Sequence, residues 1–191
     1  MKKISSKSFY DENIDITEYK SSQIKRHELK LSKKRKKDYY QYITDNIPEE
    51  YKQGDMICLG TRNNNEKDMF NSLLENANVF SLDISGKSNA DYVMSFNSFE
   101  DVDWKDKWDI IYSNSLDHAP DATQTFFEWI DILNPEGLLI IDFDFITDAL
   151  TTADCTTFDR ETVMDFLTSN GFEVIKEIKR GETNSTFFIT K

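Results

Sequence analysis

The sequence lacks the features of several protein classes. Two cysteines, Cys58 and Cys155, and two histidines are too few for a disulfide framework or a zinc site of ordinary spacing, so we expect free thiols and no metal. Six glycines and three prolines exclude collagen-like and flexible low-complexity chains. No apolar run reaches the ~18 residues of a membrane span, and no secretory signal is apparent. We therefore expect a soluble, cytoplasmic protein.

Charge is also unevenly distributed along the chain. The formal net charge is -12, which disfavours a protein that coats nucleic acid or acidic lipid through general positive charge. Residues 1–50 carry net +3 and residues 51–191 carry net -15. A length of 191 residues suits one compact body of ordinary size. We therefore predict a basic helical appendage over 1–50 and a globular domain over 51–191.

The basic excess is concentrated in residues 24–38, IKRHELKLSKKRKKD, which have good helix formers and no Gly or Pro. We predict a surface helix there, followed by aromatic residues that dock onto the body. A solvated helix face is the simplest interpretation of the charge, and a patch that steers an anionic substrate or nucleic acid is the alternative. The patch would consist of Lys33, Lys34, Arg35, Lys36 and Lys37, and the docking residues are Tyr39, Tyr40, Tyr42 and Ile43.

From residue 55 onward, short apolar runs alternate with amphipathic segments. That alternation is typical of a parallel sheet with crossover helices. Asp121 and Asp159 stand where helix N-caps are expected. The predicted strands are 55–59, 79–83, 91–95, 109–113 and 138–143, and the predicted helices are 66–76, 121–133 and 159–171.

The last twenty residues alternate apolar with polar positions on both sides of GETN, which predicts an antiparallel hairpin. The predicted fold is therefore α/β: a Rossmann-like three-layer sandwich whose mostly parallel, seven-stranded sheet ends in a C-terminal antiparallel hairpin.

Ligands of open α/β sheets bind beyond the carboxyl ends of the strands, so the residues after each strand are informative. LGTRNNNE follows the first strand, Asp83 ends the second, SFNSF follows the third and SNSLDHAPD follows the fourth. In this order, over residues 55–191, the segments resemble the cofactor site of class I S-adenosylmethionine-dependent methyltransferases. The resemblance implies a methyltransferase with S-adenosylmethionine as cofactor.

The chemistry of these residues suits that cofactor. Gly60 allows a ligand to approach the backbone, and Asp83, 23 residues further on, can accept hydrogen bonds from both ribose hydroxyls. Phe96 and Asn97 are candidates for stacking on adenine and hydrogen bonding to it. The predicted cofactor residues are Gly60, Thr61, Arg62, Asn64, Asp83, Ile84, Phe96, Asn97, Ser113 and Asn114.

The sequence departs from the family pattern in its glycine loop. Arg62 and Asn64 stand where the family has glycines, and Cys58 stands where it has an acidic residue. Asn64 tolerates a positive φ, and Arg62 can pair with the cofactor's amino-acid carboxylate. The link over 84–90 is too short for a helical crossover, so we predict a loop.

His118 is the candidate catalytic base, because it is the one imidazole near the expected site and a hydroxyl acceptor benefits from a base. A pocket-shaping role is the other interpretation. The segment SNSL lacks the Pro-Pro-aromatic pattern of methyltransferases that act on DNA bases. We therefore predict a small-molecule or sugar acceptor methylated at oxygen, with the N-terminal 50 residues and the insertion 145–158 overhanging its pocket.

Two alternatives remain open at this stage. A nicotinamide-dependent dehydrogenase needs G-x-G-x-x-G after the first strand, and GTRNNN supplies only the first glycine. A non-catalytic, methyltransferase-like binding module with a degraded cofactor loop is the stronger alternative. The oligomeric state is not predicted.

Overall fold

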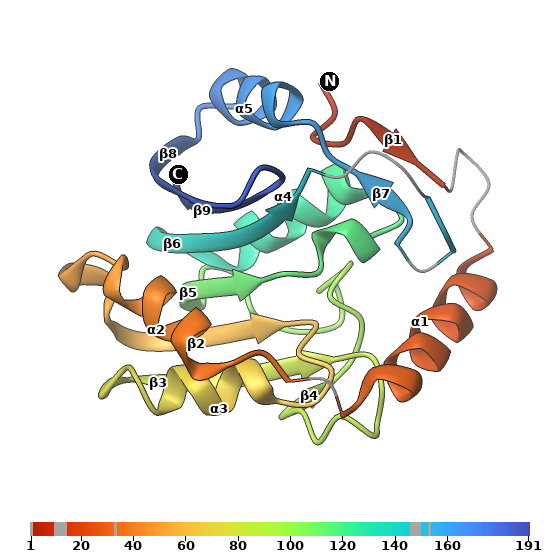
Figure 1. Ribbon diagram of the computed structural model, residues 1–191, viewed down its shortest axis with the longest axis horizontal. Helices are drawn as coiled ribbons and strands as arrows, with labels where there is room; N and C mark the ends of the chain where they lie inside the picture. Colours follow the sequence, from red (N-terminus) through yellow and green to blue (C-terminus); the bar gives the residue numbers. More distant parts are fainter. Residues whose placement is uncertain (1, 10–14, 33, 146–149, 153) are drawn as a thin grey trace.

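The computed structural model describes residues 2–9, 15–32, 34–145, 150–152 and 154–191. Within these residues, a seven-stranded sheet has the order β4-β3-β2-β5-β6-β9-β8 (Figure 1). The first five strands in that order are parallel, and β9 is antiparallel to both of its neighbours. The strands are β2 (Gln53–Leu59), β3 (Asn76–Asp83), β4 (Tyr92–Val93), β5 (Trp108–Ser113), β6 (Leu133–Asp144), β8 (Glu173–Arg180) and β9 (Asn184–Thr190).

Helices cover both faces of the sheet, and the sequence decides which side chains meet them. Successive residues of a strand point to opposite faces. Met56 and Cys58 of β2 therefore join one core cluster, whereas Ile57 and Leu59 join the other. Helices α2 (Lys37–Asp45) and α3 (Asn65–Asn71) cover the cluster that contains Met56 and Cys58. Helices α4 (Ala122–Ile132) and α5 (Arg160–Ser169) cover the cluster that contains Ile57 and Leu59.

The predicted fold class is thus confirmed, a mostly parallel seven-stranded sheet ending in an antiparallel hairpin. The N-caps are also confirmed, since the Asp121 and Asp159 side chains accept hydrogen bonds from the backbone N–H groups of Gln124 and Thr162. The predicted extents are less accurate. The third strand is confined to Tyr92–Val93, the helix after β2 ends at Asn71, and β6 starts at Leu133 without an intervening turn.

The single helix predicted over 24–38 is wrong. Helix α1 spans Ile16–Lys30, α2 begins at Lys37, and the basic residues between them are not helical within the described part of the chain. Repulsion between like charges three and four residues apart disfavours helix there. The break also lets α2 bury Tyr40 and Ile43 against the sheet, while Tyr42 stays 50% exposed.

Other segments from the first 50 residues also pack against the body. The short strand β1 (Lys7–Ser8) pairs antiparallel with β7 (Thr156–Thr157), and Ile4 is fully buried in the core on the α4 side. Helix α1 lies beyond the carboxyl ends of the parallel strands, apart from both helical layers (Figure 1). The remaining elements are two single turns, Glu49–Tyr51 and Leu116–His118.

Candidate functional site

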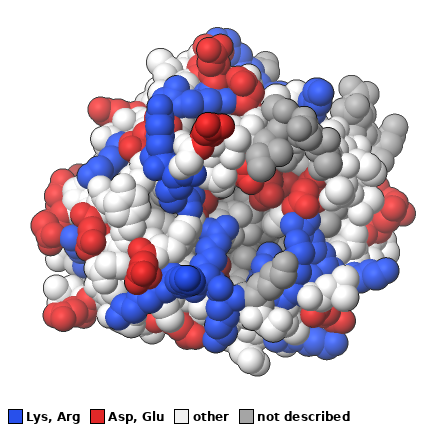
Figure 2. Space-filling model, viewed as in Figure 1, with Lys and Arg blue, Asp and Glu red and all other residues white. Residues whose placement is uncertain are grey.

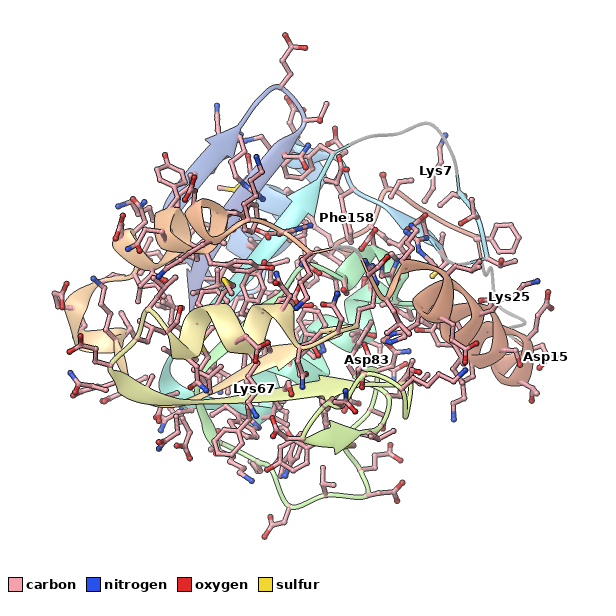
Figure 3. All side chains as sticks on the ribbon, turned by 60° about the horizontal axis from the view of Figure 1, so that its bottom comes forward. Lys7, Asp15, Lys25, Lys67, Asp83 and Phe158 are labelled. Carbon is pink, nitrogen blue, oxygen red and sulfur yellow. The ribbon has the colours of Figure 1, made fainter. Side chains whose placement is uncertain are left out.

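Asp83 ends β3 at the carboxyl edge of the sheet and is almost fully buried. Its Oδ2 accepts a hydrogen bond from the backbone N–H of Arg62 at 2.8 Å, and its Oδ1 accepts one from Ser85 at the same distance. Nδ1 of His27, on α1, lies 2.9 Å from Oδ1. In Figure 3 Asp83 lies between the sheet and α1. The carboxylate therefore joins two loops and the N-terminal helix.

The loop after β2 keeps a tight shape despite having one glycine. Gly60 has φ +78°, and a Cβ at this position would lie 2.8 Å from Ser115 Oγ. Arg62 and Asn64 also adopt positive φ, at 52° and 59°. The loop thus retains left-handed backbone conformations at Gly60, Arg62 and Asn64, and a larger residue has no space at Gly60.

A first cavity surrounds Asp83 and is closed on one side by α1. Its open volume is about 40 Å³, too small for a nucleoside, so lining side chains, several of which come from α1, would have to shift to admit one. His27 Nε2 is buried there and has no hydrogen-bond partner among the described residues. The cavity is lined by Tyr19, Gln23, Arg26, His27, Gly60, Arg62, Asp83, Ile84, Ser95, Phe96, Ser115 and His118.

A second cavity of about 320 Å³ adjoins the first and shares Arg26, Gly60, Arg62 and His118 with it. Although the chain is strongly acidic, the lining of this cavity includes five cationic side chains. Lys and Arg side chains also gather near the middle of the face seen in Figure 2. The cationic lining residues are Arg26, Lys34, Arg35, Arg62 and Arg180, and the acidic ones are Glu66, Asp117, Asp142 and Asp144.

His118 lies between the two cavities, in the turn after β5, and contacts two carboxylates. Its Nδ1 is 3.1 Å from Asp154 Oδ1 and 3.6 Å from Asp117 Oδ2. Arg26 also forms an ion pair with Asp154. Burial alone raises the pKa of the Asp154 carboxyl, but the hydrogen bonds from His118 and Arg26 outweigh burial and hold that pKa below its usual range. Asp154 thus stays ionised and orients the imidazole.

Asp142, near the end of β6, is the centre of a buried polar cluster on the wall of the second cavity. Its carboxylate accepts hydrogen bonds from the hydroxyls of Tyr39 and Tyr112, the latter at 2.7 Å. Arg180 donates at 2.9 Å and Arg35 at 3.1 Å. These contacts connect α2, and Arg35 in the basic link between α1 and α2, to β6 and β8. Arg35 of the predicted basic patch therefore lines the cavity rather than a separate surface.

The structure brings most of the predicted site residues together. The cavity walls include Gly60, Thr61, Arg62, Asp83, Ile84, Phe96, Asn114 and His118. The other three hold neighbouring backbone or side chains in place. Asn64 donates to the carbonyl of Asn89, Asn97 donates to the Tyr19 hydroxyl, and Ser113 donates to the carbonyl of Leu59.

Sequence reasoning missed the contribution of α1 and of Glu66. His27 carried a signal, as one of two histidines, but its helix is distant in sequence from Asp83. Glu66 ends the LGTRNNNE segment, and it lines the second cavity. Of the insertion 145–158, residues 146–149 and 153 lie outside the described part, and Phe158 lines the second cavity. Both cysteines are free, as predicted, and both are buried.

Comparison with known proteins was made by sequence and by structure. No protein-family model and no curated protein matches the sequence. The 1,6-didemethyltoxoflavin-N1-methyltransferase of Burkholderia thailandensis, solved with S-adenosylhomocysteine, superposes with a TM-score of 0.65 at 12% identity, covering 96% of this chain and 93% of that one. A SAM-dependent methyltransferase from Aquifex aeolicus superposes with a TM-score of 0.58 at 12% identity, covering 93% of this chain and 98% of that one.

A third structure, the mitomycin 7-O-methyltransferase MmcR, superposes with a TM-score of 0.58 at 9% identity over 85% of this chain, which spans only 54% of MmcR. The strand order and these superpositions define an open α/β fold in which the last strand of the chain, β9, is antiparallel to its neighbours. It is the fold of the class I S-adenosylmethionine-dependent methyltransferases, as the sequence resemblance predicts. Among the described residues, no helix is both long and apolar enough to cross a membrane.

Proposed function

We propose that the protein is an S-adenosylmethionine-dependent methyltransferase that methylates a small-molecule or sugar acceptor at oxygen. The observation that carries the proposal is the pair of adjoining cavities, one around the Asp83 carboxylate and one large enough for a small substrate, with His118 in the wall of both. Structural neighbours that methylate oxygen and nitrogen support the reaction class.

The residues around the first cavity fit the cofactor. Gly60 lines the cavity with no side chain of its own, and Asp83 retains acceptor capacity on Oδ2 for a ribose hydroxyl. Phe96 offers an aromatic surface for adenine, and Arg62 offers a positive charge for the amino-acid carboxylate. When bound, S-adenosylmethionine supplies a methyl group activated by the sulfonium. The positive φ angles of the loop disfavour a degraded, non-binding module.

The second cavity supplies the acceptor site in this proposal. Positioning an acceptor oxygen in line with the methyl group provides much of the acceleration. The His118 imidazole, oriented by Asp154, would take up the hydroxyl proton as the acceptor oxygen bonds to the methyl carbon and the methyl–sulfur bond breaks, which would leave S-adenosylhomocysteine. The acceptor leaves as a methyl ether, and the proton passes from the imidazole to solvent.

Calorimetric titration distinguishes this function from its alternatives. We expect S-adenosylmethionine and S-adenosylhomocysteine to bind at micromolar concentrations, and NADH to give no heat. A nicotinamide-dependent enzyme would show the reverse pattern. If neither sulfur compound binds at millimolar concentration, the methyltransferase proposal is wrong and a binding module is favoured.

The role of His118 has a separate test. We expect His118→Asn to lower the rate of methyl transfer by 10²- to 10⁴-fold, the usual contribution of a general base. Because the acceptor is unknown, turnover would be followed as S-adenosylhomocysteine formation with a panel of phenols and sugars. Cofactor affinity should stay within about threefold. A variant that transfers methyl groups at the wild-type rate would leave His118 with only a pocket-shaping role.

A further inference from the structure

Glu66 has one carboxylate oxygen that the fold does not use. The side chain extends from the first turn of α3, and its Oε1 accepts hydrogen bonds from the Tyr40 hydroxyl at 3.3 Å and from Asn114 Nδ2 at 3.2 Å. Its Oε2 is buried and has no hydrogen-bond partner among the described residues. Burial raises the pKa of this carboxyl above its usual value. A buried acceptor without a donor is costly, which suggests that a ligand supplies one.

The surroundings of Glu66 indicate what that donor is. Glu66, Gly60, Arg62 and Asn114 all line the second cavity, and Gly60 and Arg62 also line the first. The half-buried guanidinium of Arg62 therefore lies where the two cavities meet, and the buried carboxylate of Glu66 lies in the wall of the second cavity. A free α-amino acid group, with its ammonium and carboxylate on one carbon, has the complementary charges.

A second observation concerns Cys58, which occupies the position of an acidic residue in the related methyltransferases. The Cys58 side chain is fully buried, and burial raises the pKa of its thiol well above the usual value. Cys58 therefore carries no negative charge at neutral pH. Glu66 is close enough to contribute to that raised pKa, so it places a carboxylate in the same region.

We propose that Glu66 binds the α-ammonium group of the cofactor's methionine moiety, in partnership with Arg62 on the carboxylate. This inference rests on the function proposed above. In the bound state, Oε2 accepts a charge-assisted hydrogen bond from the ammonium, while Tyr40 and Asn114 hold Oε1 in place. An amino-acid group would thereby add to the compensation for burial that Tyr40 and Asn114 already provide.

Two ligands that differ in the amino-acid group test this assignment by calorimetry. S-adenosylhomocysteine has the group, whereas 5′-methylthioadenosine has the same adenine, ribose and thioether without it. We expect Glu66→Gln to weaken S-adenosylhomocysteine binding at least tenfold and to leave methylthioadenosine binding within twofold, because only the homocysteine part carries an ammonium.

Asp68→Asn is the matched control, since Asp68 is the other acidic residue in the first turn of α3 and its side chain is exposed. We expect it to change neither affinity by more than twofold. If Glu66→Gln weakens both ligands equally, Glu66 acts by supporting the fold, and if it weakens neither, the ammonium binds elsewhere. Either result overturns the assignment. Failure of both ligands to bind the wild-type protein would instead refute the proposed function.

Discussion

Replacing Asp83 with alanine is expected to lower the affinity for S-adenosylhomocysteine at least about tenfold. In the proposed complex the carboxylate accepts a hydrogen bond from a ribose hydroxyl on Oδ2, which contributes roughly 1.5–3 kcal/mol when an ionised acceptor is used. The substitution also removes the acceptor for the backbone N–H groups of Arg62 and Ser85, which loosens the loop that borders the ligand. The one ribose contact that Oδ2 can still accept corresponds to about 1.5–3 kcal/mol, or roughly one to two orders of magnitude.

The measurement is calorimetric titration of the variant, with circular dichroism to verify that it folds. Asp83→Asn is the matched control, because it keeps one carbonyl oxygen as an acceptor and should lose less affinity. Asp83→Ala should weaken methylthioadenosine as strongly as S-adenosylhomocysteine, since both contain the ribose. That pattern differs from the one expected for Glu66→Gln. An Asp83→Ala variant that folds and binds with unchanged affinity would show that the ribose contact is misassigned.

The sheet could be predicted from sequence because its signals are local. Each parallel strand is a short apolar run, and the hairpin alternates apolar with polar residues on both sides of a turn. The existence and type of these strands therefore follow from patterns within ten residues. Strand and helix ends were predicted less well. The strand that starts at Leu133 directly after α4, for example, is set by pairing with β5. Such pairing depends on residues far away in the chain.

The site could be predicted only where it follows strand ends. Gly60 and Asn114 each come directly after a strand and Asp83 is the last residue of one, so the fold alone places them at one edge of the sheet. His27 and Arg26 come from α1, whose position depends on tertiary contacts such as the ion pair between Arg26 and Asp154. Nothing in the local sequence indicates such a contact. The basic run was likewise recognised as charged, but the position of Lys34 and Arg35 in the lining of a cavity was not predictable from composition.

Replacing Asp142 with alanine should have the largest effect on stability. The carboxylate is 5% exposed and accepts hydrogen bonds from two tyrosines and two arginines, so its loss leaves several buried donors without an acceptor. Removing one partner of a buried ion pair costs about 3–5 kcal/mol. We expect a value near the lower end, about 3 kcal/mol, because Arg35 is 44% exposed and water can solvate it.

Urea denaturation followed by circular dichroism measures this loss as a lower free energy of unfolding. Asp165→Ala is the comparison, because Asp165 forms an ion pair with Lys2 in which the side chains are 60% and 56% exposed. Such pairs contribute little, so the change should stay within about 0.5 kcal/mol. Equal losses for the two variants would mean that the Asp142 cluster does not hold α2 and the basic link against the sheet. The second cavity would then lack the rigid wall on which its role as an acceptor site depends.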